Sequence, residues 1–168
     1  IRLNKVTAKA YDSTLQANGT ILLSEESEPT LNVVLKSRLD SADVGKFLPQ
    51  LEKTLHELDL KGIFNSTIEI EGPATNWQQW TSQANVTSPF ITAQGYKLSN
   101  ISLKASQNKG KIDPITLRGT FYDGDLNIHA TMLADQDKFP YEAIIKLDRL
   151  DISKFVKAFP SLRTNNIA

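Results

Sequence analysis

The sequence contains no cysteine, which excludes disulfide bonds, thiol catalysis and thiolate metal sites. Its 168 residues carry 19 basic and 19 acidic side chains, so the net charge is zero and no basic stripe for nucleic acid is expected. No apolar run approaches the roughly 18 residues that indicate a membrane-spanning helix. Zero net charge does not exclude a lipid ligand, because acyl chains are bound through apolar area rather than charge.

Motifs of catalysis and of metal binding are missing as well. No G-x-S-x-G, G-x-x-x-x-G-K or H-E-x-x-H pattern occurs. The two histidines, His56 and His129, have no acidic pattern around them, so neither is expected to bind a metal. The Asp-x-x-Asp pairs at 40–43 and 148–151 favour helix capping over acid–base chemistry. We therefore expect neither an enzyme nor a cofactor.

The sequence does contain two phrases that each occur twice. Residues 39–47 (LDSADVGKF) recur as residues 147–155 (LDRLDISKF), a displacement of 108 residues from 39 to 147. Residues 10–15 (AYDSTL) match residues 121–126 (FYDGDL), a displacement of 111 from 10 to 121. The order is the same both times, and a loop insertion accounts for the difference. Such repetition predicts an architecture that extends by stacking, with function along an extended surface.

These repeats set the expected domain organisation. The chain is a single repeat segment, 1–168, that holds about one and a half units of roughly 108 residues, with a first unit at 1–58 and a second at 59–168. The chain starts at Ile1 in the middle of a phrase. We therefore expect a piece of a larger repeat protein, with any targeting or anchoring segment outside it.

Apolar and polar residues alternate along most of the chain, the period-2 signature of half-buried strands. About ten such runs at roughly 8–12-residue spacing predict a mainly β, antiparallel fold. Asp123-Gly124 is the predicted tight turn between two of these runs. The fold class that we expect is a curled antiparallel sheet with short helices.

Each L-D-x-x-D phrase lies where a strand is predicted to end and a short amphipathic helix to begin. Asp40 or Ser41 is placed to cap the first helix. Pro49 is expected to split or kink it, and Pro160 occupies the corresponding place in the second copy. The apolar stripes of the two helices are Val44, Phe47, Leu48, Leu51, Leu55 and Leu58, and then Ile152, Phe155, Val156 and Phe159.

The apolar face of the expected sheet has two possible arrangements. A second sheet would cover it in a sandwich, whereas a single curled sheet would leave an apolar groove. Burying one Ile or Leu is worth about 2 kcal/mol, so an uncovered stripe is a liability without a ligand, and a long groove suits acyl chains. The predicted lining residues are Val33, Leu35, Ile68, Ile70, Ile101, Leu103, Ile115, Leu117, Leu126, Ile128 and Ile145.

Two alternatives stay open. Trp77 and Trp80, spaced i, i+3 after a Gly-Pro turn, are expected to close a short helical turn onto the sheet. They could instead form the sugar-binding platform of a β-sandwich that serves as an adhesion or glycan-binding module. The chain could also be a structural repeat that scaffolds an assembly through its edge strands.

Taken together, the phrases resemble the AsmA-like family of bacterial envelope proteins, which includes the TamB and YhdP types. The resemblance spans essentially the whole chain as a set of short motifs. It is carried by Tyr11-Asp12, by residues 122–126, 39–44 and 147–152, by residues 60–64 and 68–72, by Asn76-Trp77 and by residues 95–103.

This resemblance implies a long curled sheet with a hydrophobic groove, located in the periplasm and anchored in the inner membrane by an N-terminal helix that this sequence does not include. Members of the family are implicated in moving phospholipids toward the outer membrane and in maintaining its permeability barrier. The implied role of this chain is a groove segment that binds and conducts phospholipids. Its implied partners are phospholipid acyl chains, the rest of the parent chain and other envelope proteins.

Overall fold

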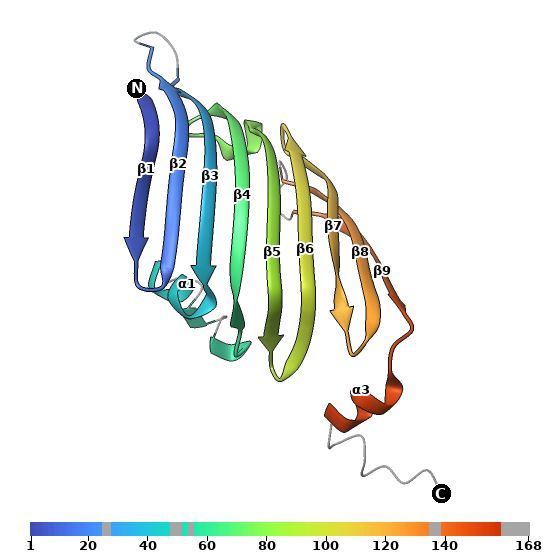
Figure 1. Ribbon diagram of the computed structural model, residues 1–168. Coiled ribbons are helices and arrows are strands. Elements are labelled where there is room, and N and C mark those ends of the chain that lie inside the picture. Colours follow the sequence, from blue (N-terminus) through green and yellow to red (C-terminus); the bar gives the residue numbers. More distant parts are fainter. Residues whose placement is uncertain (25–27, 48–51, 54–55, 135–138, 159–168) are drawn as a thin grey trace, which may run out of the picture.

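The computed structural model describes residues 1–24, 28–47, 52–53, 56–134 and 139–158 (Figure 1). Predictions that concern Leu48, Pro49, Leu51, Leu55, Phe159 and Pro160 lie outside the described residues.

Nine strands form one antiparallel sheet in which each strand pairs with its neighbours in sequence (Figure 1). The sheet is curled and does not close, so the prediction of a mainly β, antiparallel and curled fold is confirmed. Within the described residues there is no second sheet of the kind that a sandwich requires. The strands are β1 (Arg2–Ala10), β2 (Ser13–Leu22), β3 (Thr30–Asp40), β4 (Lys61–Pro73), β5 (Thr81–Ala93), β6 (Tyr96–Asn108), β7 (Lys111–Phe121), β8 (Gly124–Leu133) and β9 (Tyr141–Asp148).

Four hairpins close through two-residue turns, and three of these turns, at 94–95, 109–110 and 122–123, share one backbone geometry. Both turn residues have positive φ in each case, as a type I′ turn requires. The right-handed twist of such turns matches that of the flanking strands, so they fix the pairing of β5–β6, β6–β7 and β7–β8.

The predicted turn at Asp123-Gly124 was wrong by one residue. The turn residues are Tyr122 and Asp123, with φ of 45° and 62°, while Gly124 begins β8 and pairs with Phe121. Gly124 instead allows the backbone after β9 to approach the start of β8 closely. A Cβ at this position would lie 2.9 Å from the carbonyl oxygen of Asp148, because the chain leaving β9 crosses there.

Two α-helices and one 3-10 turn accompany the sheet, and the described residues 52–53 and 56–57 are helical as well. Helix α1 (Ser41–Phe47) contacts the ends of β3 and β4, and α3 (Ile152–Ala158) follows β9 (Figure 1). The 3-10 turn η1 (Trp77–Gln79) connects β4 to β5, which confirms the predicted short helical turn. In the part of the chain that the structure describes, no helix is long and apolar enough to cross a membrane.

The single layer leaves the protein with little buried core. The chain exposes 11,765 Å², whereas a compact monomer of 18.7 kDa exposes about 8,300 Å². Among the described residues, only Val33, Ile101 and Ala134 are buried apolar side chains. The stability of the sheet therefore depends strongly on its backbone ladder and on contacts within one face.

Replacing Gly19 with alanine tests this dependence on close backbone pairing. Gly19, in β2, has a φ of 147°, and a Cβ there would lie 2.1 Å from the carbonyl oxygen of Asn32. We expect Gly19→Ala to lower the free energy of unfolding by about 3 kcal/mol, because β2 and β3 must separate locally. Urea denaturation measures the loss.

The matched control is Gly119→Ala, where the nearest atom to the added Cβ is the carbonyl oxygen of Ser99 at 3.2 Å. We expect this substitution to cost about 1 kcal/mol. Equal losses for the two variants would contradict the importance of the β2–β3 approach.

Candidate functional site

The eleven residues predicted to line a groove all lie on one face of the sheet. Directly paired residues of neighbouring strands share a face. The register pairs Val33 with Ile70 and Leu35 with Ile68, and it joins β6 to β9 through Leu103, Leu117, Ile128 and Ile145. Ile101, Ile115 and Leu126 lie two residues from members of that series, so they face the same way. We call this the apolar face.

One row of the apolar face is apolar in every strand. The pairs follow one another from β1 to β9 without a polar interruption, which at about 4.8 Å per strand spans roughly 38 Å across the sheet. We call it the apolar row. Its members are Val6, Ala17, Leu35, Ile68, Ala84, Ala105, Ile115, Ala130 and Ala143.

On the opposite face, the row of paired residues one position along each strand from the apolar row is mainly polar. Eight of its nine positions carry polar or charged side chains, and the exception is Ile144 in β9. The members of this polar row are Thr7, Gln16, Lys36, Thr67, Asn85, Lys104, Thr116, His129 and Ile144. The two faces thus differ in chemistry across the whole width of the sheet.

Exposure of the apolar face varies from strand to strand. Val33 and Ile101 are buried, at 7% and 6% exposed, although the described residues form no second sheet over them. At the edge, Ile145 and Tyr141 are 67% and 75% exposed. The face is therefore sheltered over its inner strands and open at β9, and the role of its residues in binding a ligand stays a prediction.

Helix α1 borders a pocket of about 520 Å³ at one end of the apolar face. Apolar walls come from Leu15, Leu35, Leu39, Val44 and Ile68, joined by small side chains of β1, β2, β3 and β4. Three of these five, Leu15, Leu39 and Val44, were not among the predicted lining residues. The alternation of 31–39 already placed Leu39 on the same side as Leu35, so that signal was available in the sequence.

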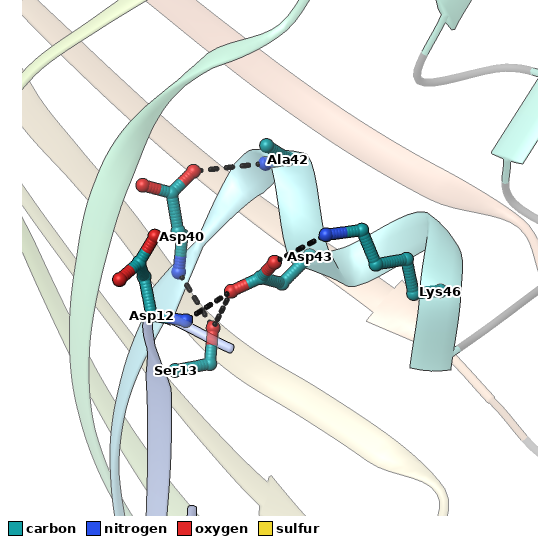
Figure 2. Close-up of polar contacts among 6 residues, drawn as sticks. All are labelled: Asp12, Ser13, Asp40, Ala42, Asp43 and Lys46. Carbon is teal, nitrogen blue, oxygen red and sulfur yellow. Dashed lines mark hydrogen bonds and ion pairs between the residues drawn. The ribbon is translucent and has the colours of Figure 1, made fainter. Parts of the chain in front are cut away.

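A network of polar contacts holds α1 against the β1–β2 hairpin (Figure 2). The buried carboxylate of Asp43 accepts hydrogen bonds from the backbone N–H of Asp12 at 3.1 Å and from Ser13 Oγ at 2.8 Å. Lys46 Nζ lies 2.9 Å from the other carboxylate oxygen. Ser13 Oγ in turn accepts from the backbone N–H of Asp40 at 3.0 Å. We call Ser13, Asp43 and Lys46 the clasp.

The charges in the clasp stabilise each other. The hydrogen bond from Lys46 holds the pKa of the Asp43 carboxyl below its ordinary value near 3.8, against the opposing effect of burial, and the donors on Ser13 and Asp12 add to it. The same contact raises the pKa of Lys46. Lys46 Nζ also lies 3.9 Å above the ring of Tyr11. Asp43 is thus held as a carboxylate with a structural role.

The capping prediction for Asp40 is confirmed. Its Oδ1 accepts a hydrogen bond from the backbone N–H of Ala42 at 2.9 Å (Figure 2). Ser41, the other candidate, instead accepts from the backbone N–H of Gly62 at 2.9 Å and thereby holds the start of β4. For Asp43, first-turn capping was too narrow a description, because this residue joins the helix to a hairpin about thirty residues earlier.

The second copies of the two phrases also contact each other. The backbone N–H of Asp151 donates to the carbonyl oxygen of Tyr122 at 3.0 Å, and Lys154 pairs with Asp123. The Phe155 ring meets the Tyr122 ring edge-on, with centroids 5.6 Å apart. Asp151 caps α3 by accepting from the backbone N–H of Lys154 at 3.0 Å. At both ends of the sheet, then, a Tyr-Asp turn contacts the helix of an L-D-x-x-D phrase.

The two tryptophans do not present matching surfaces. Trp80 is half-buried, and its Nε1 donates to the carbonyl oxygen of Pro73 at 2.7 Å. Trp77 is 42% exposed, and its ring lies 6.3 Å from that of Phe139. The pair therefore closes the β4–β5 connection mainly through Trp80.

Groups of three or more His, Cys, Asp or Glu that could hold a metal ion do not occur among the described residues. His129 lies exposed in the polar row, paired with Thr116. Comparisons of the chain with protein-family models, with curated proteins and with solved structures found no match.

Asp43→Asn should loosen the clasp. An amide keeps the shape of the carboxylate but loses the ion pair with Lys46 and one acceptor, so we expect a Tm lower by roughly 5 °C at pH 7. Because folding lowers the pKa of Asp43, its contribution is present above the ordinary value near 3.8 and is lost as the pH falls through the lower folded value. As the pH falls below about 4, the stability of Asp43→Asn should therefore decrease less than that of the parent protein.

Asp151→Asn is the control, since asparagine is an equally good helix cap. Thermal unfolding across a pH series measures both variants. If Asp151→Asn lowered Tm as much as Asp43→Asn, the clasp would have no special role.

Proposed function

We propose that this chain is a lipid-binding segment of a bacterial envelope protein, and that its apolar face binds phospholipid acyl chains. The observation that carries the proposal is the apolar row, which crosses all nine strands without a polar side chain. An enzyme site needs convergent polar groups, whereas an acyl chain needs only continuous apolar area.

The dimensions of the apolar row suit this ligand. An acyl chain spans about half of the roughly 30 Å hydrocarbon core of a bilayer, so the row of roughly 38 Å can accommodate more than one chain length. The row runs across the strands, in the direction in which added strands would lengthen the sheet. Acyl chains could slide along such a uniform groove without a catalytic step, and the direction of transfer would come from elsewhere.

The proposal includes the AsmA-like family and its repeat organisation. The contact between the Tyr-Asp turn and the L-D-x-x-D helix at both ends of the sheet supports repeated units. The sheet itself continues from β3 to β4 across the proposed boundary between 1–58 and 59–168. In this proposal the parent protein lies in the periplasm, is anchored in the inner membrane by a segment outside this chain, and supports the integrity of the outer membrane.

A glycan-binding module is the second candidate, based on the exposed ring of Trp77 beside Phe139. The internal hydrogen bond of Trp80 removes half of the expected platform. Tryptophan fluorescence during glycan and lipid titrations distinguishes the two, because a response to sugars but not lipids would favour the glycan role.

Photocrosslinking in living cells tests the lipid proposal directly. A photoreactive residue at Ile128 would lie on the apolar face, and one at Asn127 would lie on the other face of the same strand. We expect lipid adducts at Ile128 and none at Asn127 in the full-length protein. A folded protein without adducts at either position would contradict acyl-chain binding on this face.

Purified protein allows a quantitative version. Leu117 and Ile128 pair directly across β7 and β8, and both are half-buried. We expect the double variant Leu117→Asn/Ile128→Asn to weaken phospholipid binding about thirtyfold, equivalent to roughly 2 kcal/mol of lost apolar contact. Titration with a fluorescent phospholipid measures the affinity.

The matched control changes the adjacent pair on the opposite face, as Thr116→Asn/His129→Asn. It should leave the affinity within twofold. Equal weakening by both double variants, with folding intact by circular dichroism, would mean that the apolar face is not the binding surface.

A further inference from the structure

Two serine hydroxyls lie in the otherwise apolar wall of the pocket beside α1. Ser37 in β3 and Ser66 in β4 pair directly, and their Oγ atoms are 2.7 Å apart, so one hydroxyl donates a hydrogen bond to the other. Both residues line the pocket and are half-buried. Strands β3 and β4 each pair with a strand on both sides, so the position of the two serines does not depend on an edge of the sheet.

The surroundings of this serine pair are apolar. Its neighbours on the same face of the sheet lie two residues away along β3 and β4 and directly across the ladders to β2 and β5. These neighbours are Leu15, Leu35, Leu39, Phe64, Ile68 and Val86. A hydroxyl in such a setting costs free energy for every hydrogen bond that it fails to make.

The hydrogen bond within the pair uses only one of the two hydroxyl protons. A serine hydroxyl has one proton to donate and two lone pairs that accept. The hydroxyl that donates to its partner has therefore used its proton. The proton of the accepting hydroxyl meets no acceptor among the residues that the structure describes. The pair thus offers one O–H donor to a ligand in the pocket.

The rest of the pocket favours a neutral ligand. No charged side chain is among its described lining residues. A carboxylate or a phosphate placed there would lose its hydration without a cation to pair with, which is costly. An ester carbonyl brings only a hydrogen-bond acceptor, and its acyl chain can lie on the apolar walls. The volume of about 520 Å³ falls within the roughly 300–1,000 Å³ of pockets that hold small molecules.

The second copy of the repeated phrases has neither the hydroxyl nor the space. Ser37 corresponds to Ile145 at the displacement of 108 residues. Ala10, which lines the pocket, corresponds to Phe121 at the displacement of 111. The Phe121 ring packs with the Phe155 ring of α3, with centroids 6.2 Å apart. The pocket and its donor therefore belong to the first copy alone, as a binding site would and a general feature of the repeat would not.

We propose that the pocket beside α1 binds an acyl ester, whose carbonyl oxygen accepts a hydrogen bond from the Ser37–Ser66 pair while its acyl chain lies against the apolar walls. This site rests on the proposed function and deepens it, because it assigns a place to the polar end of the bound chain. The clasp holds α1, and with it the Val44 side of the pocket, in position. A lipid that moves along the apolar face would have one preferred position there.

Two lipids that differ only in their ester carbonyls test the site on the unmodified protein. The probe is a short-chain diester phosphatidylcholine below its micelle concentration, and the reference is the diether analogue with the same chains and headgroup. We expect the diester to bind about fivefold more tightly, which corresponds to roughly 1 kcal/mol for one neutral hydrogen bond. Calorimetric titration measures both affinities. Equal affinities overturn the ester site and leave the proposed function standing, whereas binding of neither lipid overturns both.

The double variant Ser37→Ala/Ser66→Ala tests the assignment to this pair. Because both hydroxyls are removed together, neither is left unpaired and the fold should be retained. We expect the diester to bind about fivefold more weakly than to the parent protein, and the diether affinity to be nearly unchanged.

The matched control, Thr87→Ala/Ser102→Ala, removes two directly paired hydroxyl residues from the opposite face. It should keep the preference for the diester. If that preference survived in Ser37→Ala/Ser66→Ala, with folding intact by circular dichroism, the serine pair would not be the donor and the proposed site would be overturned.

Discussion

The register between neighbouring strands is the constraint on which the rest of this structure depends. Side chains alternate between faces, so a slip of one residue in any pair would move an apolar series to the solvent side. The register shifts at several places, for example between Gly62 and Asn65 and between Ile112 and Ile115. Even so, every strand contributes an apolar residue to the same row. The two-residue turns at 94–95, 109–110 and 122–123 help to keep this phase.

A one-layer fold has few apolar contacts with which to attach a helix, and the clasp shows how polar contacts take their place. Asp43 joins α1 to the β1–β2 hairpin through two donors, the Asp12 N–H and the Ser13 hydroxyl, and Lys46 of the same helix holds its other carboxylate oxygen. Ser41 joins α1 to β4. Helix α3, in the second copy of the phrase, is attached by different groups. The Phe155 ring contacts the Tyr122 ring, and Lys154 pairs with Asp123. The same short phrase thus supports two kinds of attachment, one through hydrogen bonds to the Asp43 carboxylate and one through an aromatic contact together with an ion pair.

Local pattern in the sequence was sufficient for the strands and their faces, since alternation depends only on neighbouring residues. It placed Leu35, Ile68 and Ile128 on one side correctly. Contacts between residues far apart in the sequence could not be predicted from this local pattern. The role of Asp43 depends on a hairpin about thirty residues away, and the role of Gly124 depends on where the chain leaves β9. Ile144 was unremarkable as one more apolar residue until the register placed it in a polar row.

The order of the strands has a consequence for how the chain reaches its native state. Each strand pairs only with those next to it in sequence, so most ladders close a short loop, and the contact order of the sheet is low. A strand that has just emerged can dock on the one before it without waiting for the remainder. Such a sheet can assemble progressively from one end, as repeat proteins do. Its elongation in evolution would require no rearrangement of the strands already present.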